Sequence, residues 1–154
     1  MNIHVYLRKL DPAARLPNQR VGDVGFDLFC LTETVIPARS VGRVPTGIAF
    51  ADDVSYSATF KSVPFFKIEG RSSLALKGYY PIGGIIDPSY RGEIVGIMTN
   101  MTDAPWVIKP GEKFAQLVCC LTYARTPEIS VRLNEVSEAK ETVRGTNGFG
   151  STGA

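Results

Sequence analysis

The chain has 154 residues, a formal net charge of +2, 44% hydrophobic residues and 21% charged residues, values typical of one soluble globular domain. Lysine and arginine do not cluster, which argues against nucleic-acid binding, and no apolar run is long enough to span a membrane. The N-terminus lacks the basic-then-apolar pattern of a signal peptide, and Cys30, Cys119 and Cys120 form no Cys-x-x-Cys pair. We therefore expect a soluble cytoplasmic or nuclear protein with reduced thiols and no membrane contact.

Short β-rich segments, separated by Pro, Gly, Asn or Asp, recur along most of the chain. They predict strands at residues 3–7, 35–37, 41–44, 47–50, 92–98 and 114–123. Many short strands at this spacing favour an all-β fold, either a β-barrel or a jelly roll. We predict one domain over residues 1–154, with a β-barrel core at 1–143 and a mobile glycine-rich arm at 144–154.

Helical signals are sparse. Residues 72–78 begin with two hydroxyl side chains and end at a glycine, which predicts one or two helical turns, and residues 134–142 are a candidate for another turn. Residues 51–66 carry Asp52, Asp53 and the pair Phe65-Phe66, and they predict a long hairpin or excursion between two strands.

Five short segments carry most of the functional information. They are Gly-Phe-Asp-Leu at 25–28, Gly-Arg-Ser-Ser-Leu-Ala at 70–75, the glycine-rich hairpin at 83–93, Gly-Glu-Lys-Phe-Ala-Gln-Leu at 111–117, and the tail from residue 144. In this order they resemble the five motifs of the trimeric dUTP nucleotidohydrolases (dUTPases), over nearly the whole chain.

The resemblance implies a distorted jelly-roll subunit with one short helix, and a homotrimer whose three active sites are shared at subunit junctions. It also implies Mg²⁺ and hydrolysis of dUTP to dUMP and pyrophosphate, by attack of an Asp-activated water on the α-phosphate. Such an enzyme keeps uracil out of DNA and supplies dUMP for dTMP synthesis.

The second segment offers a phosphate site. A helix start presents unpaired N–H groups to an anion, Arg71 can add a charge-assisted hydrogen bond, and Ser72 and Ser73 can add hydroxyl donors. An isolated Arg-Ser-Ser would more often mean only that Ser72 caps the helix. The surrounding motifs favour phosphate binding.

The hairpin offers the catalytic group. Asp87 on a tight turn can hold and activate a water, and Tyr90 resembles the aromatic residue that packs under the deoxyribose. Outside the motif, Asp87 would be a common turn aspartate before Pro88, and Tyr90 an ordinary core tyrosine.

Uracil recognition in the family uses main-chain groups, which map here to residues 82–86 and in particular to Gly84, Ile85 and Ile86. A glycine at 84 permits close backbone approach, and fixed backbone groups can reject cytosine. The alternative is that Gly83 and Gly84 only make the turn.

Asp27 matches the acidic residue that orders the water shell of Mg²⁺, the ion itself being held mainly by the substrate phosphates. Alternatively, Asp27 sits at a strand end and caps a turn. Gln116 resembles the glutamine near the α-phosphate.

In the tail, the resemblance assigns phosphate pairing to Arg144, uracil stacking to Phe149, and closure over the phosphates to Gly150, Ser151 and Thr152.

Three features depart from the family pattern. Gly70 and Ser73 replace the usual proline and glycine around Arg71, the stretch 47–71 is longer than usual, and Pro81 lies in the base-binding hairpin, where it cannot donate an N–H.

Two other functions compete with the dUTPase interpretation. A dCTP deaminase shares the fold, but it needs a glutamate at the position that Ile97 occupies. Zinc-dependent deaminases need a set of histidine and cysteine ligands, whereas this chain has His4 as its single histidine and no Cys-x-x-Cys pair. A non-catalytic binding protein on the same barrel would be expected to have lost Asp87, Arg71 or the tail, and all are present.

Overall fold

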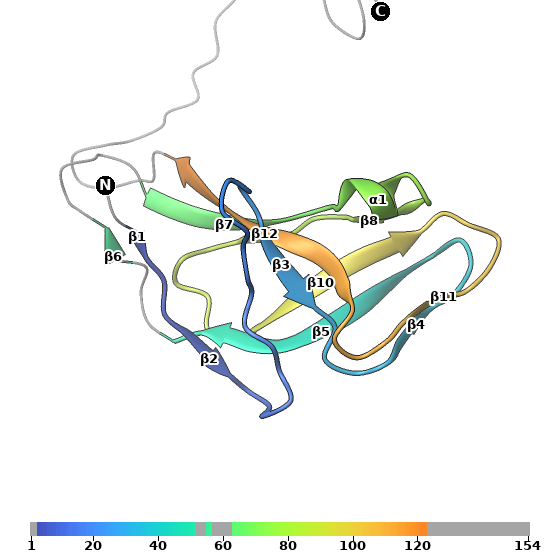
Figure 1. The fold of residues 1–154 in the computed structure, drawn as a ribbon, viewed down its shortest axis with the longest axis horizontal. Helices are drawn as coiled ribbons and strands as arrows, with labels where there is room; N and C mark the ends of the chain where they lie inside the picture. Colours follow the sequence, from blue (N-terminus) through green and yellow to red (C-terminus); the bar gives the residue numbers. More distant parts are fainter. Residues whose placement is uncertain (1–2, 52–54, 57–62, 123–154) are drawn as a thin grey trace, which may run out of the picture.

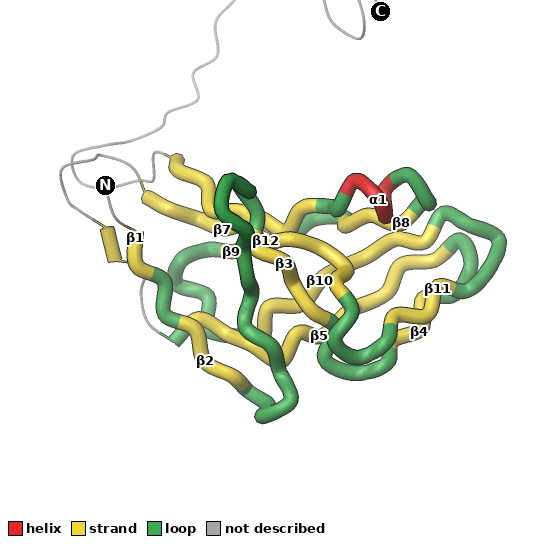
Figure 2. The backbone as a smooth tube through the Cα atoms, in the orientation of Figure 1, coloured by secondary structure: helices red, strands yellow, loops and turns green. Residues whose placement is uncertain are grey.

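The structure is a computed structural model that describes residues 3–51, 55–56 and 63–122. Strands dominate it, and the one helix of this part of the chain is a single turn (Figure 2). The elements in chain order are β1 (Ile3–His4), β2 (Leu7–Lys9), β3 (Phe26–Phe29), β4 (Thr34–Ile36), β5 (Ser40–Phe50), β6 (Ser55–Tyr56), β7 (Val63–Glu69), α1 (Ser72–Ala75), β8 (Tyr79–Pro81), β9 (Ile85–Ile86), β10 (Glu93–Asn100), β11 (Trp106–Ile108) and β12 (Lys113–Thr122).

Two four-stranded antiparallel sheets form the body of the molecule (Figure 1), with strand orders β2-β5-β10-β8 and β3-β12-β7-β9. Two ribbons complete it: β4 pairs with β11 at one end of the molecule, and β1 pairs with β6 at the other. Every strand pair is antiparallel, and neighbouring strands in a sheet are mostly far apart in sequence. This is the all-β, jelly-roll-like architecture that the sequence predicts.

The core lies between the sheets. Phe50, Phe114, Leu28, Ile48 and Ile94 are among its largest fully buried side chains. Along β10 every second residue, from 94 to 100, points into this core, whereas the residues between them stay partly exposed on the outer face. The outer face of β10 is therefore free to form the wall of a surface cavity.

The predicted strands 41–44 and 47–50 are one continuous strand, β5. The sequence suggested a break because Pro45 and Gly47 interrupt the pattern. In the structure the interruption is a bulge, because the pairing of β10 with β5 shifts register between Glu93 and Val95. At the bulge Gly47 takes a φ of 68°, and the Thr46 hydroxyl donates a hydrogen bond of 2.5 Å to the Ile94 carbonyl. Conversely, the single strand predicted at 3–7 is two strands in the structure, since β1 ends at His4 and β2 begins at Leu7.

The predicted helix 72–78 is shorter than expected. Only α1 is helical, its N-cap is Arg71 with no side-chain capping bond, and the chain then turns to Gly78, whose φ is 86°. Ser72 is therefore not the cap. None of the helical structure among the described residues is long or apolar enough to cross a membrane.

The predicted excursion 51–66 ends earlier than expected, because β7 begins at Val63 and includes Phe65 and Phe66. Phe66 is buried in the core and packs against Phe50 with ring centroids 5.0 Å apart. The two aromatic residues therefore belong to the barrel. Asp52, Asp53, the possible turn at 134–142 and the arm at 144–154 lie outside the described residues.

Candidate active site

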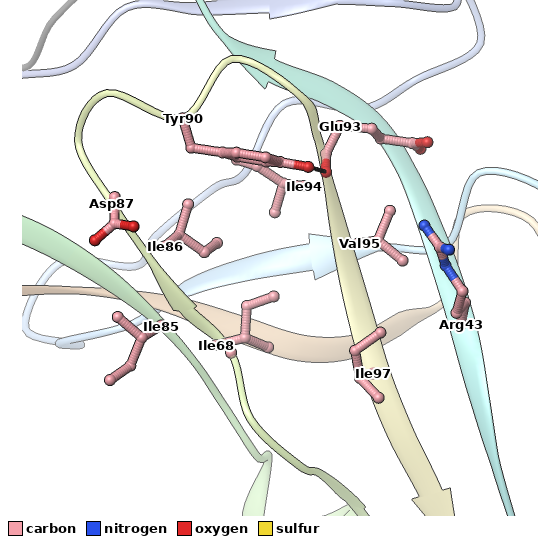
Figure 3. Close-up of a pocket in the computed structure, with 11 residues that line it drawn as sticks. Arg43, Ile68, Ile85, Ile86, Asp87, Tyr90, Glu93, Ile94, Val95 and Ile97 are labelled. Atoms are coloured by element: carbon pink, nitrogen blue, oxygen red, sulfur yellow. Dashed lines mark hydrogen bonds between the residues drawn. The ribbon is translucent and has the colours of Figure 1, made fainter.

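An apolar cavity of about 290 Å³ lies between β9, the turn that follows it, and the outer face of β10 (Figure 3). Its lining contains Gly84, Ile85, Ile86, Asp87 and Tyr90, the hairpin residues singled out for base, sugar and catalysis, but not residues 82 and 83 of the predicted base-binding stretch 82–86. Most of the remaining wall is aliphatic, from Ile68 on β7 and from Ile94, Val95 and Ile97 on β10. Its size and its mixed aliphatic and polar lining suit a small, partly apolar ligand.

Gly84 lets the hairpin approach the barrel closely. Its φ is 103°, and its carbonyl accepts a hydrogen bond of 2.9 Å from the Ile68 N–H. A Cβ at this position would lie 3.1 Å from the Ile68 Cβ, in a backbone conformation that side chains rarely adopt. A glycine is therefore required here for the backbone at residues 83–86 to keep its course along the cavity.

A tight turn fixes Asp87 and Tyr90 relative to each other, since the Tyr90 N–H donates to the Asp87 carbonyl at 3.0 Å. The Asp87 carboxylate is exposed at the edge of the cavity. The Tyr90 hydroxyl donates to the Glu93 carbonyl at 3.2 Å, which holds the ring along the cavity wall (Figure 3). Tyr90 is 46% exposed, so it is not a core tyrosine.

Gly92 is part of the same arrangement, although no role for it was predicted. A Cβ on Gly92 would lie 2.2 Å from the Tyr90 hydroxyl oxygen. Any side chain at position 92 would therefore displace the Tyr90 ring from the cavity wall.

A second, more polar cavity of about 440 Å³ collects the other predicted residues. Its lining includes Asp27 on β3, Gln116 on β12, and Arg71, Ser72 and Ser73 at the start of α1. Strand pairing creates this grouping. Asp27 on β3 lies opposite Gln116 on β12. On its other side β12 pairs with β7, and the chain continues from β7 to the start of α1. The Gln116 amide donates to the Gly70 carbonyl at 2.8 Å.

Asp27 lies between two cations. Its Oδ2 is 2.7 Å from the Lys113 Nζ, and its Oδ1 is 3.4 Å from the Arg71 Nε. Arg71 is further tied to the chain by a bond of 3.4 Å from Nη1 to the Lys113 carbonyl. Asp27 is inside β3 rather than at a strand end, so the alternative of a turn cap is wrong.

Lys113 is a site residue that sequence reasoning missed. The fourth segment was identified, but only Gln116 was singled out from it. Lys113 begins β12, where the pairing with β3 shifts register between Lys113 and Ala115, and its side chain reaches Asp27 on the neighbouring strand. Sequence analysis also did not single out Arg20 and Asp23, which line the polar cavity together with Asp27.

Comparison with known proteins agrees with these motifs. The family model described as dUTPase matches residues 11–153. The chain belongs to the dUTPase family. It is 36% identical over 149 residues to the deoxyuridine 5'-triphosphate nucleotidohydrolase of Oryza sativa subsp. japonica, covering 96% of this chain and 79% of that protein. It is 35% identical over 153 residues to the Helicobacter pylori J99 protein of the same name, covering 97% of this chain and 96% of that protein.

Solved structures of dUTPases share the fold. The EIAV dUTPase superposes with a TM-score of 0.66 at 27% identity, covering 86% of this chain and all of that one. A Staphylococcus bacteriophage 80alpha dUTPase, solved as a mutant with dUpNHpp, superposes with a TM-score of 0.70 over 99% of both chains at 22% identity. The predicted jelly-roll fold and membership of a hydrolase family are thus confirmed, and the individual residue roles remain predictions.

The polar cavity is the candidate place for the Mg²⁺ expected of a dUTPase. Among the described residues no three His, Cys, Asp or Glu side chains come together, so this part of the chain offers no chelating cluster of three such ligands. The two carboxylates of the polar cavity, Asp23 and Asp27, and its two serine hydroxyls fit an ion that keeps its waters and is held mainly by phosphates. The residues present therefore fit the predicted water-mediated role of Asp27.

The two cavities share no lining residue. Within one chain of this dUTPase-family protein, the groups predicted for the nucleoside and those predicted for the phosphates are therefore separated. The tail residues Arg144, Phe149, Gly150, Ser151 and Thr152 lie outside the described residues. Ile97 lines the first cavity at the position where a dCTP deaminase would need its glutamate.

Proposed function

We propose that this protein hydrolyses dUTP to dUMP and pyrophosphate, with Asp87 as the general base that activates the attacking water. Family membership supports the reaction, and the exposed carboxylate at the edge of a nucleoside-sized cavity supports the residue. Hydrolysis would keep uracil out of DNA and provide dUMP for dTMP synthesis.

The apolar cavity takes the deoxyuridine. Tyr90 lies under the deoxyribose and leaves no room for a 2′-hydroxyl, while backbone groups of residues 82–86 contact uracil. Pro81 ends β8 opposite Met98 and has no N–H, so it can only contribute its carbonyl. Ile97 cannot shuttle protons, which disfavours deamination at this site.

The polar cavity takes the triphosphate. Arg71 and Lys113 supply positive charge, Ser72 and Ser73 supply hydroxyl donors, and Gln116 lies near the α-phosphate. Asp27 would orient waters of a Mg²⁺ ion, which neutralises phosphate charge when bound. In the tail, Arg144 pairs with phosphate, Phe149 stacks on uracil, and Gly150, Ser151 and Thr152 close over the phosphates.

The observation that carries this proposal is the division of the site between two cavities of one chain. Both cavities can form one active site when the nucleoside cavity of one subunit faces the phosphate cavity of another. A homotrimer with three shared sites meets this requirement, since a cyclic arrangement repeats the same head-to-tail contact until the ring closes.

Subunit mixing tests the shared site. Asp87→Asn and Arg71→Ala should each lower kcat, the former by about 10²–10⁴-fold as expected for loss of a general base. When the two variants are co-expressed and purified as mixed trimers, dUTP hydrolysis should partly return, because some sites combine an intact Asp87 with an intact Arg71 from different chains. Pyrophosphate release measures the rate.

The matched control replaces the Arg71→Ala partner with the double variant Asp87→Asn/Arg71→Ala. Mixed trimers of this kind contain no intact Asp87, so they should stay inactive. Mixed trimers of the single variants that also remain inactive would mean that Asp87 and Arg71 of one site come from the same chain.

A further inference from the structure

We propose that Glu93 is a positioning residue for sugar selection, because its side chain holds in place the backbone against which the Tyr90 ring lies. This inference rests on the proposed function and extends it, since it assigns part of the preference for deoxyribose to a side chain for which the sequence predicts no role. Glu93 begins β10 and lines the same cavity as Asp87 and Tyr90.

The Tyr90 ring lies directly against the backbone of residues 92 and 93. Its hydroxyl donates to the Glu93 carbonyl at 3.2 Å, and a Cβ on Gly92 would lie only 2.5 Å from the Cζ atom of the ring and 2.9 Å from its Cε2. Figure 3 shows the ring extending from the turn to the start of β10. Because these contacts are with main-chain atoms, a shift of the backbone at residues 92–93 moves the ring.

The start of β10 is paired with the irregular part of β5. Residues 46–48 of β5 face the single residue Ile94 of β10, so this stretch cannot continue the regular ladder. A buried backbone N–H that loses its ladder partner needs another acceptor. The Glu93 carboxylate supplies one, since its Oε1 accepts the Gly47 N–H at 2.8 Å.

Gly47 is a fixed attachment point for this bond. Its φ is 68°, and a Cβ there would lie 2.9 Å from the Ala14 Cβ and 2.9 Å from a methyl carbon of Leu31. Its carbonyl accepts the Leu10 N–H at 2.7 Å. The bond to Gly47 therefore ties the Glu93 side chain to a closely packed part of the barrel.

The bonds within the turn do not replace this connection. The Tyr90 N–H donates to the Asp87 carbonyl, and the Arg91 guanidinium donates to carbonyls of the turn itself. These bonds shape the turn but do not join it to another strand. Figure 3 shows the Glu93 side chain directed away from the Tyr90 ring and toward β5, on the side of Arg43.

The position of the ring decides whether the site has room for one more oxygen atom. A ring fixed under the deoxyribose excludes a 2′-hydroxyl, whereas a ring that can move away from the sugar admits it. Loss of the Glu93 carboxylate leaves the proposed base and phosphate contacts in place. It should therefore favour UTP relative to dUTP more than it weakens dUTP itself.

The test compares kcat/KM for dUTP and UTP in the full-length protein and in Glu93→Leu, which cannot accept the Gly47 N–H. The ratio for dUTP over UTP should fall about 3- to 10-fold, a part of the roughly 100-fold by which an apolar pocket rejects one added hydroxyl. Glu93→Gln keeps an acceptor oxygen and should retain the ratio. Glu33→Leu removes an exposed glutamate outside the cavity and should change neither constant.

A double variant separates positioning from a general loss of structure. In a Tyr90→Ala protein the ring is absent, so adding Glu93→Leu should not lower the ratio further. Independent losses from the two changes would overturn the proposal. Equal losses for dUTP and UTP in Glu93→Leu, an unchanged ratio, or the same fall in Glu93→Gln would each overturn it as well.

Calorimetric binding of dUMP and UMP measures the same sugar preference without hydrolysis, so Glu93 can be judged even if the proposed reaction fails. Thermal unfolding verifies that each variant is folded. If Glu93→Leu is not folded, Glu93→Ala replaces it, with the same expected fall in the ratio.

Discussion

At the scale of single residues, the candidate site depends on a few positions where the backbone leaves no room for a side chain. Gly25 faces Gln116, Gly84 faces Ile68, and Gly92 faces the Tyr90 hydroxyl, with a Cβ–Oε1 distance of only 2.1 Å in the first case. Gly25 and Gly92 therefore leave room for the predicted ligand-binding side chains of Gln116 and Tyr90, and Gly84 lets the hairpin backbone lie close to β7.

Tyr90 is the residue whose role can be tested most directly. Tyr90→Ala should reduce the preference for dUTP over UTP, because the ring that would exclude a 2′-hydroxyl is gone, and it should have little effect on stability because the ring is half exposed. Tyr90→Phe keeps the ring and loses only the bond to Glu93, so it should retain the preference. Competition between the two nucleotides measures this ratio, and equal preferences in all three proteins would place sugar recognition elsewhere.

At the scale of elements, the end of β10 is joined to the β4–β11 ribbon by one buried side chain. The Asn100 amide donates to the carbonyls of Ile36, Pro37 and Ala104 at 2.8–3.1 Å, and its own carbonyl accepts from Thr102. Asn100 is 1% exposed. It therefore satisfies backbone groups that water does not reach.

Asn100→Ala should lower the free energy of unfolding by about 1–3 kcal/mol, the cost of leaving buried carbonyls without donors. The midpoint of denaturant unfolding measures this loss. Thr99→Ala is the matched control, since Thr99 is the neighbouring residue on the partly exposed face of β10 and should change the midpoint much less. Similar midpoints for Asn100→Ala and the native protein would show that the ribbon is held in place by packing alone.

The strands also show where sequence reasoning fails at this scale. Segments with a clear apolar pattern, such as 92–98 and 114–123, are close to β10 and β12. The short strands β3, β6, β8, β9 and β11 were not predicted, because most are too short to show a period. The seven-residue β7 was missed as well, because half of it falls in the stretch 51–66 that was predicted as an excursion. Strand β5 was predicted in two pieces because a bulge around Gly47 looks like a break in the sequence.

At the scale of the whole molecule, the separation of the two cavities makes assembly part of the proposed chemistry. Removal of residues 144–154 should leave a folded trimer. Light scattering should then give three times the mass of the shortened chain, which is the 16.8 kDa of the full chain minus the mass of the deleted residues. The deleted segment has Phe149 as its one large apolar residue, so the core should not need it.

The same truncation should nearly abolish dUTP hydrolysis, because Arg144, Phe149, Ser151 and Thr152 are assigned to closure over the substrate. Phe149→Ala alone should weaken nucleotide binding by about 1–3 kcal/mol, the usual range for one base–aromatic stack. A truncated protein that hydrolyses dUTP at the full-length rate would contradict the role given to the arm. A monomer in light scattering would contradict the shared site.

The sequence by itself determined the family and the set of motif residues, because the motifs are local: a glycine, an aspartate and a tyrosine within one hairpin can be recognised without knowing what surrounds them. Only the tertiary structure decided which motifs meet. Strand pairing puts Asp27 opposite Gln116 and beside Lys113, and it puts Arg43 opposite Ile97 at the cavity that holds Asp87. These partners are 50 or more residues apart in the chain, and only the sheet register, which single-sequence patterns do not specify, brings them together.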